Sequence, residues 1–121
     1  MAHRFFKTRR FSVDARKALI TDAALVAAMK EAISGQADNL GGGAWKKRLN
    51  ENRHRAIVLA RGRRYWVFQF LFAKSDQSNI TAQELAAFKA LAKTYEGLCD
   101  QQVRQLLEMK EFVEIGHDQE I

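Results

Sequence analysis

The chain has 121 residues, 47% of them hydrophobic, and no proline, which suits one compact domain with a real core and argues against disorder. Its formal net charge of +6 favours a polyanionic partner. The single cysteine, Cys99, excludes an internal disulfide, no apolar run reaches the roughly 20 residues that span a bilayer, and no secretory signal follows the basic N-terminus, so we expect a cytoplasmic protein.

The charge is unevenly distributed along the chain. Residues 1–17 carry six cations and one acid, and residues 44–74 carry nine cations and one acid. Residues 75–121 carry four cations and nine acids. The positive potential is therefore predicted to lie in the first strand and the central sheet.

The N-terminal part predicts a strand followed by a helix. Residues 4–11 place three phenylalanines among cations, which favours an opening strand. Thr21 or Asp22 can cap a helix with apolar residues at helical spacing, and Gly35 is a natural stop for it. Residues 36–43 predict a loop that ends in three glycines, interpreted as a flexible entry to a strand rather than a phosphate-binding loop.

Residues 45–73 predict an antiparallel meander of strands 45–49, 54–60 and 65–73, joined by polar turns. Alternation places Lys46 and Arg48 on one face of the first strand. It places Trp45, Lys47 and Leu49 on the other face. It places His54 and Arg55 on opposite faces of the second strand. In the third strand it predicts one core-facing aromatic row, made of Trp66, Phe68, Phe70 and Phe72.

The C-terminal part predicts two helices and a last strand. Thr81 and Glu84 form a capping box, which begins a helix that runs to about residue 98. Asp100 can cap a further short helix, and residues 112–115 predict a short strand. We therefore expect a single domain over residues 1–115 and a mobile polar tail over residues 116–121.

The cation-rich sheet has two interpretations. Lysines and arginines on exposed strands keep sheet edges soluble. Nine cations with one acid over residues 44–74 exceed what that task requires, and nucleic acid is the commonest polyanion. Trp45 and Tyr65 could stack on bases, although residues of this kind are more often part of a core.

Cations alone permit RNA cleavage without a metal. The reaction needs a deprotonated 2′-hydroxyl, a stabilised phosphorane and a protonated 5′-oxygen leaving group, and arginine or lysine can stabilise the phosphorane. Like-charged neighbours make a lysine easier to deprotonate, so Lys46 beside Arg48 is a candidate general base. No two histidines lie at a metal-ligand spacing, so neither a metal nor another cofactor is expected.

Three blocks of sequence together resemble the RelE/HigB-like toxins of type II toxin–antitoxin systems, within the phage-associated branch of the RelE/ParE superfamily. They are residues 40–49 (Leu-Gly-Gly-Gly-Ala-Trp-Lys-Lys-Arg-Leu), the strand that carries Arg55, and residues 72–80 (Phe-Ala-Lys-Ser-Asp-Gln-Ser-Asn-Ile) before the helix with Glu84 and Leu85. The similarity extends from about Phe5 to Ile115.

The resemblance implies an α+β, two-layer RelE-like fold, with helices packed on one face of a twisted, mostly antiparallel sheet and a concave basic face. It implies metal-independent cleavage of mRNA, usually on the translating ribosome. It also implies neutralisation by a cognate antitoxin, which in this branch is expected to carry a helix-turn-helix domain.

The resemblance also assigns the site. Lys46 and Arg48 match the paired basic residues at the scissile phosphate, Arg55 matches a phosphate-binding arginine, and Lys74 matches the basic residue that closes the last strand of the meander. Further RNA contacts are expected from Lys47, Arg53, His54 and Arg63.

This chain departs from the best-studied ribonucleases of the family at two positions. Ser75 stands where they have an arginine, and no clear tyrosine or histidine acid/base follows late in the chain, since Thr81 and His117 are poor substitutes. Two alternatives therefore stay open. One is a non-catalytic toxin that inhibits a protein such as DNA gyrase, as in the ParE group, and the other is a degenerate toxin that retains only antitoxin binding.

Overall fold

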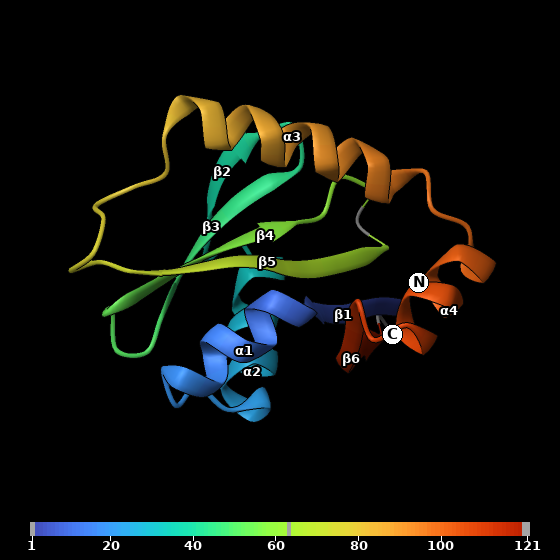
Figure 1. The fold of residues 1–121 in the computed structure, drawn as a ribbon, viewed down its shortest axis with the longest axis horizontal. Helices are drawn as coiled ribbons and strands as arrows, with labels where there is room; N and C mark the ends of the chain where they lie inside the picture. Colours follow the sequence, from blue (N-terminus) through green and yellow to red (C-terminus); the bar gives the residue numbers. More distant parts are fainter. Residues whose placement is uncertain (1, 63, 120–121) are drawn as a thin grey trace.

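A computed structural model describes residues 2–62 and 64–119, so that Met1, Arg63, Glu120 and Ile121 lie outside the described residues. The helices are α1 (Arg9–Lys17), α2 (Asp22–Ile33), α3 (Ala82–Glu96) and α4 (Asp100–Glu108). The strands are β1 (Ala2–Thr8), β2 (Asp38–Gly41), β3 (Ala44–Leu49), β4 (His54–Leu59), β5 (Tyr65–Ala73) and β6 (Phe112–Gln119). Figure 1 shows how these elements are arranged.

The six strands form one twisted sheet in the order β2-β3-β4-β5-β1-β6. Strands β3 to β5 form the antiparallel meander expected from the sequence, and β2, in a segment expected to be a loop, adds to it by pairing antiparallel with β3. Strand β1 pairs with β5 in parallel, and β6 pairs with β1 antiparallel. The expected α+β fold with a mostly antiparallel sheet is therefore confirmed.

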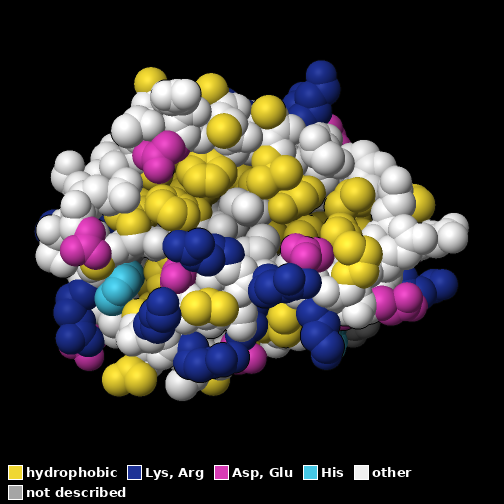
Figure 2. All heavy atoms as spheres, viewed as in Figure 1, with side chains coloured by type: hydrophobic (Ala, Val, Ile, Leu, Met, Phe, Trp, Pro, Cys, Tyr) yellow, Lys and Arg dark blue, Asp and Glu magenta, His cyan; other side chains and the backbone are white. Residues whose placement is uncertain are grey.

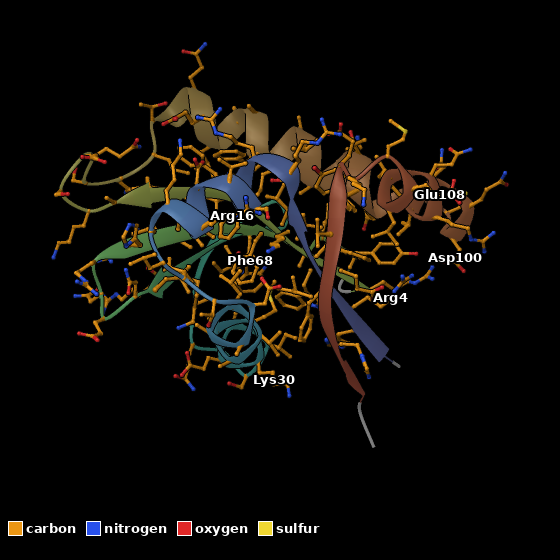
Figure 3. All side chains as sticks on the ribbon, turned by 60° about the horizontal axis from the view of Figure 1, so that its bottom comes forward. Arg4, Arg16, Lys30, Phe68, Asp100 and Glu108 are labelled. Carbon is orange, nitrogen blue, oxygen red and sulfur yellow. The ribbon has the colours of Figure 1, made fainter. Side chains whose placement is uncertain are left out.

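The helices divide between the two faces of the sheet, instead of lying on one face as expected (Figure 1). Helices α1 and α2 pack on the face that carries Phe68, which lies between these helices and the sheet (Figure 3). Helices α3 and α4 pack on the opposite face, over two smaller apolar clusters. Both faces of β5 are consequently buried under helices along part of its length.

A β-bulge explains how one aromatic strand serves both faces. Ile57 pairs with Phe70, but the next residue, Val58, pairs with Phe68, so Gln69 is an extra residue in β5. An extra residue reverses the alternation beyond it. The prediction of a single aromatic row was therefore wrong: Trp66 and Phe68 belong to the cluster under α1 and α2, and Phe70 and Phe72 to the cluster under α3.

The N-terminal strand is shorter than predicted, and a helix follows it. Strand β1 ends at Thr8, whose side-chain oxygen accepts a hydrogen bond of 3.1 Å from the backbone N–H of Phe11 and so caps α1. Phe11 is fully buried, and its ring stacks on Phe68 with 5.0 Å between ring centres. Phe11 is thus a core residue of a helix rather than the end of the strand.

The glycine run makes a tight turn between β2 and β3, where a loop and a flexible entry were expected. Gly41, Gly42 and Gly43 all have positive φ, of 88°, 62° and 88°. A Cβ on Gly43 would lie 2.7 Å from the backbone Cα of Arg61, and one on Gly42 would lie 2.8 Å from the side chain of Lys89. Both the backbone conformation and the close packing therefore require glycine at this turn.

The C-terminal strand is longer than predicted. Strand β6 continues through Gly116 to Gln119 and pairs with β1 as far as Ala2, so these residues belong to the last strand, and the mobility expected of the tail stays a prediction. Helix α3 begins as expected, with a capping box at Thr81 and Glu84, whereas the N-cap of α4 is Cys99 and the expected cap, Asp100, is the first residue of the helix. At the start of α4, Asp100 accepts a hydrogen bond of 2.7 Å from the Tyr65 hydroxyl, which ties α4 to the sheet.

Candidate nucleic-acid interface

Three cations of the meander, Lys46, Arg48 and Arg55, share one face of the sheet. They lie near the end of the sheet where the turn joins β3 to β4, which is called its open end below. Lys46 and Arg48 lie two residues apart on β3, and Arg48 is directly opposite Arg55 on β4. The Ala60 N–H donates a hydrogen bond of 2.8 Å to the Gly43 C=O, so Gly43 and Ala60 are a hydrogen-bonded pair of β3 and β4. Hydrogen-bonded and non-hydrogen-bonded pairs alternate along antiparallel strands, which makes Arg48 and Arg55 a non-hydrogen-bonded pair. Side chains leave the backbone closest together at such pairs, so Arg48 and Arg55 project from adjacent positions on one face.

The Arg55 guanidinium is held by the turn between β3 and β4. Its Nη1 donates to the backbone oxygens of Asn52, at 3.0 Å, and His54, at 3.1 Å. The turn residues Asn50, Glu51 and Asn52 have positive φ of 52°, 53° and 70°, an uncommon conformation for residues other than glycine. Arg55 therefore points toward the turn, at one end of the basic surface.

Lys46 and Arg48 border a hollow of about 380 Å³ beside the chain that enters β2, formed by residues 35–38 and 46–48. The Lys46 ammonium lies 4.0 Å from a carboxylate oxygen of Asp38 and 3.4 Å from the side-chain oxygen of Asn79. Arg48 is exposed. Asn79 belongs to the loop between β5 and α3, so this loop contacts the basic surface.

Lys74 lies at a second hollow at the end of the sheet. Its backbone N–H donates to the Arg53 oxygen at 2.9 Å, which extends the ladder one residue past β5. This hollow has a volume of about 640 Å³, and its lining includes Arg53, His54 and Ser75. The structure thus brings Lys46, Arg48 and Arg55 together, and places Lys74 in a neighbouring group.

His54 and Arg53 are oriented by Asn50. The His54 Nδ1 lies 3.1 Å from the side-chain amide nitrogen of Asn50, and Arg53 donates to the side-chain oxygen of Asn50 at 3.1 Å. His54 is on the face opposite Arg55, as alternation predicts. It reaches the second hollow because both faces meet at the end of the sheet.

Lys47 lines the first hollow beside Lys46 and Arg48, but its ammonium is directed to the other face of the sheet. It lies on the face that α2 covers, with 8% of its surface exposed, and its ammonium is 3.1 Å from a carboxylate oxygen of Glu31. The proposed contact from Arg63 lies outside the described residues. Of the further RNA contacts expected from the sequence, Arg53 and His54 are the ones that the structure places at the end of the sheet.

The aromatic side chains available for stacking are not those expected. Trp45 packs against Trp66 on the α2 side, and Tyr65 is 7% exposed, so both belong to the core. Phe70 is only partly buried, stacks on Phe72 with 5.8 Å between ring centres, and lies on the same face as Arg55. The sequence analysis placed Phe70 in the core-facing row, because the alternating pattern of β5 does not reveal the bulge at Gln69.

No acid/base side chain of the kind expected lies beside Lys46, Arg48 and Arg55 in the described residues. The Thr81 hydroxyl accepts from the Glu84 N–H at 3.0 Å and so caps α3. His117 pairs with Arg4 at the opposite edge of the sheet. Tyr95 packs on Phe112, and burial raises the pKa of its phenol to about 12.

Comparison with protein families is consistent with this geometry. Within the described residues, every helix is too short or too polar to cross a bilayer. No curated protein and no solved structure gives a significant match to the sequence. The model of the family described as the RelE toxin of the RelE/RelB toxin–antitoxin system matches residues 3–115, which is most of the chain. The protein therefore belongs to the RelE toxin family, whose members act with a cognate antitoxin.

Proposed function

We propose that this toxin is a metal-independent endoribonuclease that cleaves mRNA on the translating ribosome. The observation that carries the proposal is the direct cross-strand pairing of Arg48 with Arg55, with Lys46 on the same face. Like charges directly opposite each other destabilise a sheet, so an anion that contacts both Arg48 and Arg55 would relieve their repulsion. A phosphate of RNA is such an anion.

The proposed reaction divides the work among these cations. The 2′-oxygen attacks phosphorus, the bond from phosphorus to the 5′-oxygen breaks, and a 2′,3′-cyclic phosphate and a 5′-hydroxyl result. Arg48 and Arg55 would bind the phosphate and stabilise the extra negative charge of the phosphorane. Lys46, in its neutral amine form, would accept the proton of the 2′-hydroxyl and become an ammonium, and solvent or the ribosome would protonate the 5′-oxygen.

Flanking nucleotides would follow the open end of the sheet. Lys74, Arg53 and His54 line the second hollow and would contact the phosphates on one side of the cleaved bond. Phe70, partly exposed on the same face as Arg55, would offer a surface for stacking a base. By the same resemblance, the antitoxin would carry a helix-turn-helix domain, and both proteins would act in the cytoplasm.

The test is cleavage of mRNA by purified toxin on programmed ribosomes, with the RNA ends mapped by primer extension. Arg48→Gln and Lys46→Gln each remove one charge of the surface, and we expect each to slow cleavage at least about 100-fold, the scale found when one charge-stabilising donor is removed from an active site. The matched control is Lys47→Met, which changes the intervening residue of the same strand on the opposite face. Equal loss in all three variants would show that the effect is structural.

A second function is favoured by one observation. In the described part of the chain, the candidate acid/base residues Thr81, His117 and Tyr95 lie away from these cations, which suits a toxin that binds and inhibits a protein target such as DNA gyrase without cleaving RNA. Intact mRNA on ribosomes, together with inhibition of gyrase supercoiling by the purified toxin, would support this candidate. A toxin that does neither, and allows normal growth when strongly induced, would retain antitoxin binding alone.

A further inference from the structure

The edge of β3 is unpaired beside Arg48. Strand β2 begins at Asp38, which pairs with Lys46, and within the described residues no strand continues this pairing past Lys46. Arg48 and Arg55 are a non-hydrogen-bonded pair of β3 and β4, so the backbone N–H and C=O of Arg48 face away from β4. Both groups are therefore directed toward the first hollow, which has a volume of about 380 Å³.

The opposite wall of the first hollow is the chain between α2 and β2. The Gln36 N–H donates a hydrogen bond of 2.9 Å to the Glu31 oxygen, which folds this chain back on the end of α2. The wall ends at Asp38, whose side chain is 66% exposed and lies 4.0 Å from the Lys46 ammonium, the outer limit of an ion pair. Its carboxylate therefore keeps most of its capacity to accept hydrogen bonds. Asp38 is the one acid among the described residues that line the hollow.

Asp38 is an acid beside the cations that would bind phosphate. Figure 2 shows how widely lysines and arginines are spread over the lower half of one face of the molecule. Such cations bind the phosphates of any sequence and do not distinguish bases, and a carboxylate among them weakens phosphate binding. The N–H groups of bases, in contrast, donate hydrogen bonds to carboxylates. Asp38 is thus suited to a base rather than to a phosphate.

We propose that the first hollow binds a guanine base of the RNA, next to the scissile phosphate. Guanine presents two adjacent donors, N1–H and the N2 amino group, and the acceptor O6 beside them. The Asp38 carboxylate would accept from both donors, and the Arg48 backbone N–H would donate to O6. Arg48 lies two residues beyond Lys46, the partner of Asp38, so the two groups are separated by roughly 7 Å along the strand and a base can lie between them.

The same groups select against the other bases. Adenine presents the acceptor N1 to the carboxylate where guanine presents N1–H, so two acceptors would face each other without a proton between them. Cytosine and uracil each offer one donor group, flanked by an acceptor. The side chains of Lys46 and Arg48 border the same hollow, so a nucleotide whose base enters it has its phosphate beside the cations of the proposed site. The inference rests on the proposed function, because it takes RNA as the ligand, and it adds the base that the site would select.

The first test compares cleavage on programmed ribosomes. The messages differ only at the nucleotides on either side of the cut, and kcat/KM is measured with guanosine, inosine or adenosine at each position. We expect guanosine at one of these positions to raise kcat/KM at least about tenfold over adenosine, and inosine, which lacks the N2 amino group, to fall between them. In Asp38→Asn this preference should disappear while cleavage continues. The matched control is Asp76→Asn, which removes the same charge from the exposed loop after β5 and should keep the preference.

The second test measures binding without ribosomes and without cleavage. The probes are short 2′-O-methyl oligonucleotides of uridine with one central guanosine or adenosine, and the readout is fluorescence anisotropy. Asp38→Asn should bind the guanosine probe more weakly than the wild type does. It should bind the adenosine probe as tightly or more tightly, since a negative charge near the phosphates is gone. Equal loss of affinity for both probes would show that Asp38 is only structural and would overturn the proposal.

The outcomes separate this inference from the proposed enzyme. Equal cleavage of the guanosine and adenosine messages by the wild type, or a preference that survives Asp38→Asn, would overturn the guanine subsite and leave the enzyme standing. A toxin that cleaves no RNA would refute the enzyme, and the binding test would then decide the subsite alone. In that case equal affinity for both probes, or no binding of either, would overturn it.

Discussion

Replacing Arg48 with glutamine is expected to make the protein more stable, although it should disable the site. Arg48 and Arg55 form a non-hydrogen-bonded pair, where Cα atoms are about 4.5 Å apart, and a directly opposed pair on a sheet is worth roughly 0.2–1 kcal/mol. Both side chains contact solvent, so we place the gain in the free energy of unfolding near the middle of that range, at about 0.5 kcal/mol. Arg48→Glu replaces the repulsion with an attraction to Arg55 and should raise the free energy of unfolding by about 1 kcal/mol.

The assay is urea denaturation, because urea does not screen charge as guanidinium does. A double-mutant cycle with Arg55→Gln isolates the interaction from the backbone hydrogen bonds that Arg55 also makes. The coupling should shrink in 1 M salt, where screening acts over about 3 Å. Arg104→Gln, an exposed cation of α4, serves as the control and should change stability little. A coupling energy of zero at low salt, or a less stable Arg48→Gln variant, would refute the claim that these charges repel.

Three other predictions follow from the site and its supports. In RNA binding, the magnitude of the slope of log K for binding against log salt concentration should fall by about 0.7 for each of Lys46→Gln and Arg48→Gln, because each removes one phosphate contact. The slope should not change for Lys47→Met, and equal slopes for all three variants would contradict the assignment of faces. Gly43→Ala should destabilise the fold by roughly 2 kcal/mol or more, measured by thermal unfolding, because of its positive φ and the contact with Arg61; a neutral result would show that the turn can shift. Finally, the Tyr65 hydroxyl and the Arg64 guanidinium lower the pKa of Asp100 (labelled in Figure 3), so the stability that this carboxylate contributes is present above about pH 4 and is lost as the pH falls through its lowered value. Asp100→Asn should therefore flatten the acid limb of the stability profile below pH 4, and an unchanged acid limb would show that the contact is not linked to folding.

Much of the meander could be predicted from the sequence because its strands β3 and β4 are regular. Alternation alone placed Lys46 and Arg48 on one face and separated His54 from Arg55, and the register confirms both. The same rule failed in β5, since nothing in a run of aromatic residues marks Gln69 as an extra one. The division of the aromatic side chains between two cores therefore became visible only with the partner strand in place.

The edges of the sheet were harder to predict. Helix α1 has few apolar residues, and its buried Phe11 and Ala15 also fit the end of a strand. Strand β2 is four residues long and leads into glycines, so its sequence reads as a loop. Lys47 was counted with the RNA contacts because a charged residue is expected to be exposed, whereas Glu31 of α2, distant in sequence, pairs with it. Such pairings depend on tertiary contacts that no local pattern contains.

The pairing of β6 with β1 has a consequence for how the toxin matures. Strand β6 lies against β1, so closing this part of the sheet brings together residues as distant in sequence as His3 and Asp118. Contacts of such sequence separation form slowly and late in folding. Until β6 docks, β1 pairs with β5 alone, so this edge of the sheet stays open until a late step of folding.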